Sequence, residues 1–120
     1  MKDLRIIETG SYNIAEILSD AIEIKNAGDA LDLMGSCYAS KAKALILREH
    51  NLSAEFFDLK TGILGEILQK FVNYDFRLAV ITDRKKYQSK NMQDFIYESN
   101  KTGRIVFIDS LEEATKRLAG

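Results

Sequence analysis

Three short, continuous runs of apolar residues constrain the fold of this chain more than any other feature. They occupy residues 44–47, 78–81 and 105–108. Runs of this length are typical of β-strands that are covered on both faces. Segments with a helical spacing of apolar residues separate them, and strands joined through helices run parallel by right-handed crossovers. The sequence therefore predicts a parallel β-sheet flanked by helices.

Two further β-favouring runs, at residues 4–7 and 14–18, come before this core. Thr9, Gly10 and Ser11 lie between them and supply the chemistry of a tight turn. The pair predicts an antiparallel hairpin. Because the hairpin adds an antiparallel partner, the predicted sheet is mixed and has about five strands.

Four segments with helical periodicity predict about four flanking helices. Asn26 and Ser89 are good N-caps, Ser110 opens a capping box, and Gly103 suits the C-terminal end of the third helix. The predicted helices occupy about residues 27–39, 62–73, 90–102 and 111 onward. Residues 52–61 are ambiguous between a loop and an earlier helical turn.

The composition fits a single α/β domain over residues 1–120, with the element order β-β-α-β-α-β-α-β-α. Hydrophobic residues make up 46% of the chain, which is typical of a globular protein that folds without a metal or a disulfide. The 17 Lys and Arg residues nearly balance the 18 Asp and Glu residues. A net charge of −1 gives no overall field that attracts nucleic acid or an anionic membrane, so we expect neither as a partner.

The single cysteine and the N-terminal residues bear on the compartment. One cysteine, Cys37, excludes an internal disulfide, and its place in the apolar stripe of the first predicted helix indicates a buried, structural thiol. Residues 1–7 lack the long apolar core of a signal peptide. No apolar run approaches the ~20 residues that cross a bilayer. We therefore expect a cytoplasmic protein with no membrane association.

Three segments of the chain resemble a known family. They are residues 57–68, which begin Phe-Asp-Leu-Lys-Thr-Gly, residues 81–87, Ile-Thr-Asp-Arg-Lys-Lys-Tyr, and residues 94–100, Asp-Phe-Ile-Tyr-Glu-Ser-Asn. The family is an uncharacterised bacterial one, domain of unknown function 4180, and the similarity extends over nearly the whole chain. The resemblance implies a prokaryotic protein and carries no established activity.

A hairpin followed by strand–helix units also resembles the sulfate-transporter and anti-sigma-factor-antagonist (STAS) fold. That family often has an Asp-Ser-Ser-Gly-Leu-Gly signature after a central strand, and in its regulatory members a serine there is phosphorylated. Here the nearest match runs from Asp58 to Gly65, with Thr61 in the place of the acceptor and Gly62 after it. The spacing departs from the signature, since Asp58 precedes Thr61 by three positions. The resemblance implies an interaction or phospho-acceptor surface formed by Asp58, Thr61, Gly62 and Gly65.

A second candidate site lies at the predicted carboxyl ends of the parallel strands, which meet at one edge of such a sheet and commonly bind ligands. The polar residues that follow the strands there are Arg48, Glu49, His50, Asn51, Asp83, Arg84, Lys85, Asp109 and Ser110. We call this set the rim. Polar residues also occupy strand ends because the chain must leave the sheet toward water, so a plain solvated edge is the alternative interpretation.

His50 is the only histidine, and an imidazole has the chemistry of a general base or a switch. A base needs a nucleophile within reach, and no nucleophile elbow surrounds Ser53 or Thr61. The alternative is a solvated loop histidine.

The basic run at residues 84–86, together with Tyr87, Lys90 and Arg104, has the chemistry to hold a phosphate at the start of the third helix. A solvated charge run is the alternative. Gly62 and Gly65 match neither a P-loop nor a dinucleotide fingerprint, and we interpret them as allowing a helix to approach the sheet closely. No Cys or His cluster has metal-ligand spacing, so we expect no metal and no cofactor.

These features predict a non-enzymatic regulatory or protein-interaction module with a STAS-like fold, because the sequence nominates no clear nucleophile, metal or cofactor motif. The protein partner is not identified by the sequence. One alternative is a second copy of the chain, joined as a homodimer through the edge strand at residues 4–7. The alternative function is a small-molecule-binding protein or an enzyme that uses the rim.

Overall fold

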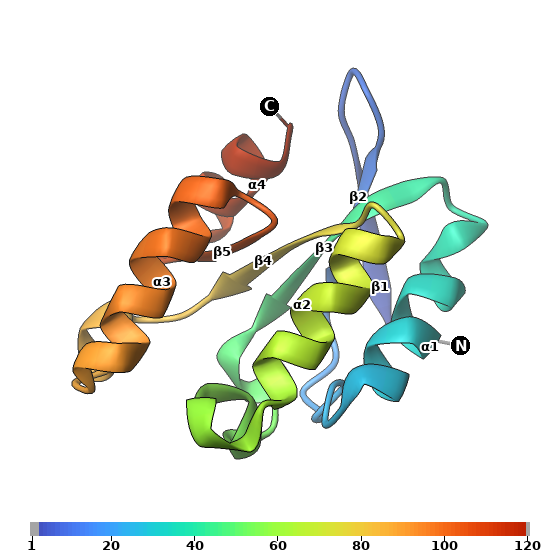
Figure 1. Cartoon of the computed structure of the whole chain (residues 1–120). Coiled ribbons are helices and arrows are strands. Elements are labelled where there is room, and N and C mark those ends of the chain that lie inside the picture. Colours follow the sequence, from blue (N-terminus) through green and yellow to red (C-terminus); the bar gives the residue numbers. More distant parts are fainter. Residues whose placement is uncertain (1–2, 120) are drawn as a thin grey trace.

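Five strands form one sheet whose spatial order follows the order of the chain, β1-β2-β3-β4-β5 (Figure 1). The computed structural model describes residues 3–119. The strands are β1 (Leu4–Glu8), β2 (Asn13–Ile17), β3 (Ala42–Arg48), β4 (Arg77–Ile81) and β5 (Ile105–Ile108). The helices are α1 (Ala27–Tyr38), α2 (Ile63–Asn73), α3 (Lys90–Thr102) and α4 (Leu111–Ala119). β1 and β2 are antiparallel and the later neighbours are parallel, which confirms the predicted mixed sheet and element order.

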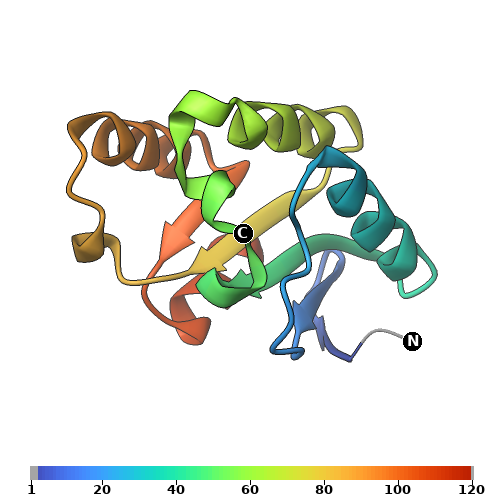
Figure 2. The ribbon, with the colours of Figure 1, turned by 90° about the horizontal axis from the view of Figure 1, so that it is seen from below.

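The helices divide unequally between the two faces of the sheet (Figure 2). Each parallel strand is added beside the one before it, so right-handed crossovers place α1, α2 and α3 on the same face. The chain turns the other way only after β5, and α4 covers the opposite face. The neighbouring strands β4 and β5 are therefore followed by helices on opposite faces of the sheet, α3 on one face and α4 on the other.

Each face of the sheet has its own buried core. On the face of α1, α2 and α3, the fully or almost fully buried side chains include Leu33, Ile67 and Ile96. On the face of α4 they include Ala114 and Leu118, which pack over the middle of the sheet. Cys37 lies in the first core with no exposed surface, so its predicted burial is confirmed.

The helix caps that the sequence indicates are formed. Asn26, Ser89 and Ser110 each accept a backbone N–H from the residue three positions later, at 2.9, 3.3 and 3.2 Å. Gly103 ends α3 with a φ of 89°, in the left-handed region that favours glycine. The predicted boundaries are correct to within a few residues, and the largest correction is that β3 begins at Ala42 rather than at residue 44.

The connection from β3 to α2, which was ambiguous in the sequence, forms three short 3-10 turns. They are η1 (Glu49–Asn51), η2 (Ala54–Phe57) and η3 (Leu59–Thr61). Fully buried Phe56 holds η2 against the core of the α1–α3 face. A fourth 3-10 turn, η4 (Arg84–Lys86), follows β4.

Arg77 on β4 ties the ends of two helices together, a role that the sequence does not indicate. Its Nε donates to the carbonyl of Gly103 at 3.1 Å, at the end of α3. Its Nη2 and Nη1 donate to the carbonyls of Arg117 and Leu118 at 3.0 and 3.4 Å, at the end of α4. The Tyr12 hydroxyl also donates to the carbonyl of Leu118. Carbonyls at a helix C-terminus lack partners within the helix, and here a strand side chain supplies them.

The two edges of the sheet differ. At β5, the Asn100 amide from α3 accepts from Phe107 N at 2.7 Å and donates to Phe107 O at 3.1 Å. The Ser99 hydroxyl donates to the carbonyl of Ile105. Side chains thus occupy outward backbone groups of β5 in place of a further strand. Within residues 3–119, no side chain covers the backbone of β1 in this way, so β1 is the open edge of the sheet.

Candidate functional site

The carboxyl ends of the parallel strands β2, β3, β4 and β5 lie side by side at the same end of the sheet, as the sequence predicts. The rim residues do not form one site there. They separate into a cluster around Glu49, a set of structural contacts made by Arg48 and Asn51, and a groove beside β5. His50 and Ser110 belong to none of these groups.

The Glu49 carboxylate is held by three side chains from the segment after β4. Its Oε1 accepts from Thr82 Oγ1 at 3.0 Å and from the Tyr87 hydroxyl at 2.7 Å. Its Oε2 accepts from Lys86 Nζ at 2.5 Å. This cluster therefore fastens η1 to η4 across the ends of β3 and β4.

Burial and hydrogen bonding set the charges in this cluster. Partial burial acts to raise the pKa of Glu49, but the hydrogen bonds from Lys86, Tyr87 and Thr82 outweigh it and hold that pKa below its ordinary value. Burial, with the adjacent Glu49 charge, raises the pKa of the Tyr87 hydroxyl well above its ordinary value. Near neutral pH, Glu49 is ionised and Tyr87 is protonated, so neither is poised to exchange a proton there.

The Tyr87 ring extends the same connection to η2. It stacks on Phe57, with ring centroids 5.2 Å apart and an interplanar angle of 17°. Phe57 in turn meets Phe56 edge to face at 5.0 Å. The cluster around Glu49 thus reaches the buried core through a series of aromatic contacts, as expected of a structural junction.

Arg48 and Asn51 are also engaged in structural contacts. Arg48 Nη2 pairs with Glu16 Oε2 at 2.8 Å, and Arg5 Nη2 pairs with Glu16 Oε1 at 2.6 Å. Glu16 is only 2% exposed, so two arginines from the flanking strands neutralise a carboxylate on β2. The alternation of side chains places Glu16 on the α4 face of the sheet.

Asn51 is fully buried, and its side-chain amide forms hydrogen bonds with the backbone of two separate segments. Its Nδ2 donates to the carbonyls of Ser19 and Ala21 at 2.9 and 2.8 Å, and its Oδ1 accepts from Arg48 N at 2.9 Å. The amide therefore holds the segment after β2 against the end of β3. A ligand cannot use these groups without breaking the fold locally.

His50 faces the segment after β2. Its Nε2 lies 3.8 Å from Asp20 Oδ1 and 3.4 Å from the carbonyl of Ser19. The side chain is half exposed. The described contacts of His50 include no hydroxyl or thiol nucleophile, and they fit the solvated loop histidine given above as the alternative.

The predicted phosphate-binding cluster is not assembled. Arg104 lies at the opposite end of the sheet, where its Nη1 donates to Asp75 Oδ1 and to the carbonyl of Phe76 at 3.1 and 3.0 Å. Lys90 pairs with Asp94 at 3.1 Å on α3. The prediction of this cluster is wrong because β4 and β5 are parallel. Arg104 precedes β5 and therefore lies beside the start of β4, whereas residues 84–86 follow the end of β4.

The remaining rim residues border a groove of about 670 Å³ beside β5. We call it the β5 groove. Asp83, Arg84 and Lys85 line it from the turn after β4, and Asp109 lines it from the end of β5. Sequence patterns do not indicate the residues that α3 and α4 contribute to the groove, which include Tyr97, Asn100, Lys101 and Arg117. Ser110 caps α4 instead.

The predicted interaction surface at residues 58–65 forms the start of α2. Asp58 caps η3 by accepting from Lys60 N at 3.1 Å. Thr61 Oγ1 lies 3.0 and 2.9 Å from the carbonyls of Glu55 and Asp58, and it accepts from Ile63 N at 3.2 Å. The Thr61 hydroxyl, although exposed, therefore links η2, η3 and α2.

The two glycines of this surface do not bring α2 closer to the sheet, so that interpretation is wrong. A Cβ added at Gly62 or Gly65 would meet nothing within 4 Å, and both residues are exposed. Gly62 is explained by its φ of 77°, which lets η3 turn into α2. Gly65 lies on the exposed side of the first turn of α2, beside the exposed Glu66, and adds no side chain of its own there.

Within residues 3–119, no helix is long and apolar enough to cross a membrane. No three His, Cys, Asp or Glu side chains of that same part of the chain are grouped so that they could hold a metal ion.

The fold and these sites define a small α/β domain with a mixed sheet and no recognisable catalytic constellation among its described residues. The chain belongs to the family described as Domain of unknown function (DUF4180), which matches residues 9–118. The resemblance to that family is therefore confirmed. No curated protein matches the chain, and no solved structure matches it either.

Proposed function

We propose that this chain is a non-enzymatic regulatory module with a STAS-like fold, which binds a protein partner through the surface at residues 58–65. The order of elements supports the fold: an antiparallel hairpin is followed by strand–helix units, and α2 follows the central strand β3. The chain departs from the STAS pattern in the three 3-10 turns that separate β3 from α2.

The observation that carries the proposal is the position of the Thr61 hydroxyl. Thr61 is an exposed residue, yet its hydroxyl holds three segments together through the carbonyls of Glu55 and Asp58 and the amide of Ile63. A phosphate at Thr61 removes the hydroxyl proton that these carbonyls share and adds roughly −1.5 to −2 charge. The start of α2 attracts that charge, because its N-cap Gly62 has no side chain to bond the first amides. Modification would therefore rearrange η3.

The surface at residues 58–65 combines an exposed apolar side chain with charged neighbours and accessible backbone, as a docking site for a protein does. Leu59, between Asp58 and Lys60, exposes 36% of its surface. Gly62 and Gly65 leave the backbone at the start of α2 accessible. A rearrangement of η3 moves Leu59 directly, which couples the state of Thr61 to the apolar contact that a partner would make.

Substitution of Thr61 separates signalling from capping. We expect Thr61→Ser to bind the same partners as the wild-type protein, because serine keeps both the hydroxyl and the cap. An aspartate at this position can still accept from Ile63 N, as Thr61 does, but cannot donate to the carbonyls, and we expect Thr61→Asp to change partner binding at least fivefold. Thr102→Asp is the matched control, because Thr102 is exposed on α3 away from this surface. Equal partner binding by Thr61→Asp and the wild-type protein would remove the basis for the switch and leave Thr61 as a cap.

The alternative function, an enzyme or ligand-binding protein that uses the whole rim, has less support. Arg48 and Asn51 are engaged in the fold, and the Glu49 carboxylate already accepts from three side chains. His50 lies beside Asp20 rather than beside Glu49. Substrate turnover that Glu49→Gln or His50→Gln abolishes, with the fold intact, would favour the alternative.

A further inference from the structure

We propose that the β5 groove binds a small organic anion with a negative group at each end, independently of the surface at residues 58–65. The proposal rests on the topology around β5, on the charges that line the groove, and on the distance over which those charges are spread.

The chain leaves β5 toward a different face of the sheet from the one it takes after the other parallel strands. The connections after β2, β3 and β4 lead to helices on one face of the sheet, whereas the connection after β5 leads to α4 on the other face. Where neighbouring parallel strands send their chains to opposite faces, a crevice opens at their carboxyl ends, and ligands of open α/β sheets bind there. The β5 groove begins at this point, between Asp83 at the end of β4 and Asp109 at the end of β5.

The lining of the β5 groove is positively charged. Four cations, Arg84, Lys85, Lys101 and Arg117, and two carboxylates line the groove, so its lining has a surplus of two positive charges in a chain whose net charge is −1. The carboxylates are already engaged: Asp109 Oδ1 lies 3.4 Å from Arg84 Nε, and Asp83 accepts from the backbone of Lys85 at 3.0 Å. Within residues 3–119, no carboxylate lies within ion-pair distance of the ammonium groups of Lys85 and Lys101.

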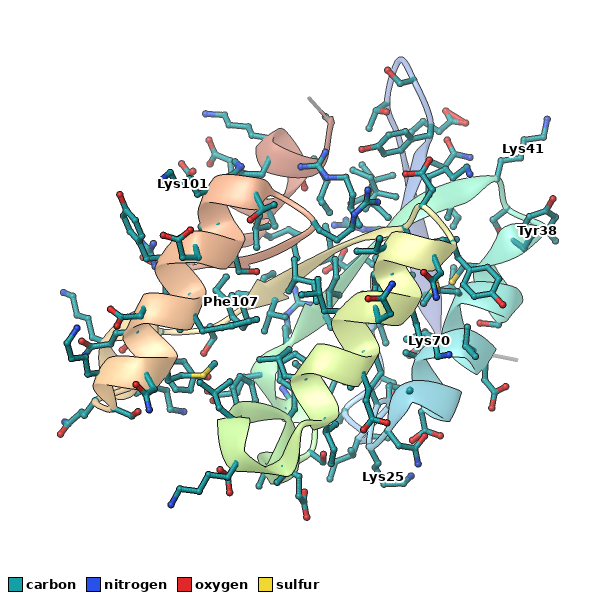
Figure 3. All side chains as sticks on the ribbon, viewed as in Figure 1. Lys25, Tyr38, Lys41, Lys70, Lys101 and Phe107 are labelled. Atoms are coloured by element: carbon teal, nitrogen blue, oxygen red, sulfur yellow. The ribbon has the colours of Figure 1, made fainter. Side chains whose placement is uncertain are left out.

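The positive charges lie at two separate ends of the β5 groove. Arg84 and Lys85 lie at the rim, while Lys101 lies at the C-terminal end of α3, close to α4 (Figure 3). Arg117 reaches the same end, where it donates to the carbonyl of Asn100. Gln93 and Lys101 both line the groove, and eight residues of helix span roughly 12 Å. The cations therefore occupy two ends, and a ligand that meets both must be elongated.

The middle of the groove suits the body of such a ligand. Ile96 forms part of its wall and is almost fully buried, while the Tyr97 ring is 66% exposed. The ammonium of Lys101 lies 5.6 Å from the centre of that ring. A volume of about 670 Å³ is within the usual range for small-molecule sites. The chemistry thus combines an apolar and aromatic wall with a cationic group at each end.

A calorimetric titration at fixed ionic strength tests this proposal with hexane-1,6-diyl bisphosphate, whose two phosphates are separated by about the length of the groove. We expect one saturable site with submillimolar affinity. Inorganic phosphate, which meets only one end, should bind at least tenfold more weakly. Thr61→Asp should leave the affinity unchanged, since the groove and the partner surface are separate.

Two single-charge variants locate the site. Lys101→Gln should weaken the bisphosphate at least fivefold, whereas Lys90→Gln, on the same helix but outside the groove, should bind as the wild-type protein does. Amide shifts in NMR spectra should concentrate at residues 83–85 and 93–101. Absence of saturable binding, equal losses in both variants, or phosphate binding as tight as that of the bisphosphate would each overturn the proposal.

Discussion

Glu49 shows how one residue can have the type and position of a catalytic acid and still serve the fold. Its sequence position, directly after a buried strand, is that of a rim residue, and the sequence cannot reveal what it meets. Its partners Thr82, Lys86 and Tyr87 belong to the next strand–helix unit, more than thirty positions away. Such long-range contacts leave no periodic signal, whereas local ones do: Asn26, Ser89 and Ser110 were readable as caps because their partners lie three residues on.

The depressed pKa of Glu49 makes a pH-dependent contribution to stability. Because that pKa is lower in the folded protein than its ordinary value of 4.5, the contribution is present above pH 4.5 and is lost as the pH falls through the folded-state pKa. We expect Glu49→Gln to lower the free energy of unfolding by about 1 kcal/mol at pH 7. The difference from the wild-type protein should shrink below pH 4.5. Urea denaturation at pH 7 and pH 3.5 measures both values, and an equal difference at the two pH values would contradict the assignment.

At the scale of elements, the sequence predicted the strands and helices well because buried strands and amphipathic helices have distinct apolar periods. It did not resolve the 3-10 turns at residues 49–61, which have no period of their own. Their conformation depends on Phe56, which reaches the core, and on Phe57, which stacks on Tyr87. The end of α4 is another such case, since Arg77 reaches it from a strand that lies forty residues earlier in the chain.

Arg77 provides a test of how the helix ends are held. Arg77→Ala leaves carbonyls at the ends of α3 and α4 without their donor, and we expect a loss of about 2–3 kcal/mol in the free energy of unfolding. Arg77→Lys keeps the charge but not the planar fork that reaches Gly103 and Arg117 together, so it should recover less than half of that loss. Thermal and urea denaturation give the values. Full stability of Arg77→Lys would mean that charge alone holds these ends.

At the scale of the whole molecule, the order of elements followed from the sequence, but the arrangement of layers did not. Nothing in the chain states that α1, α2 and α3 share one face and that α4 covers the other. That distribution depends on each strand joining beside its predecessor, which is decided by the packing of the complete sheet. The β5 groove could not be predicted from the sequence for the same reason. Lys101 and Arg117 line it together, but they belong to helices on opposite faces of the sheet.

The two cores share one set of strands, so we expect them to unfold together. Ile67→Ala removes packing from the α1–α3 face and Leu118→Ala removes it from the α4 face, and each should cost about 2–5 kcal/mol. Unfolding of both variants should remain a single transition, with coincident midpoints from far-UV circular dichroism and tyrosine fluorescence. Separate midpoints in the Leu118→Ala variant would show that α4 and its core form an independent unit.

We propose that a protein partner binds at residues 58–65, and this surface can be measured in solution. Hydrogen exchange of the full chain, alone and in complex with a partner captured from the native host, measures this most directly. We expect the partner to slow exchange of the backbone amides from residue 58 to residue 65, and Thr61→Asp to alter this protection while Thr102→Asp does not. Protection confined to β1 or to the rim, with exchange at residues 58–65 unchanged, would contradict the proposed surface.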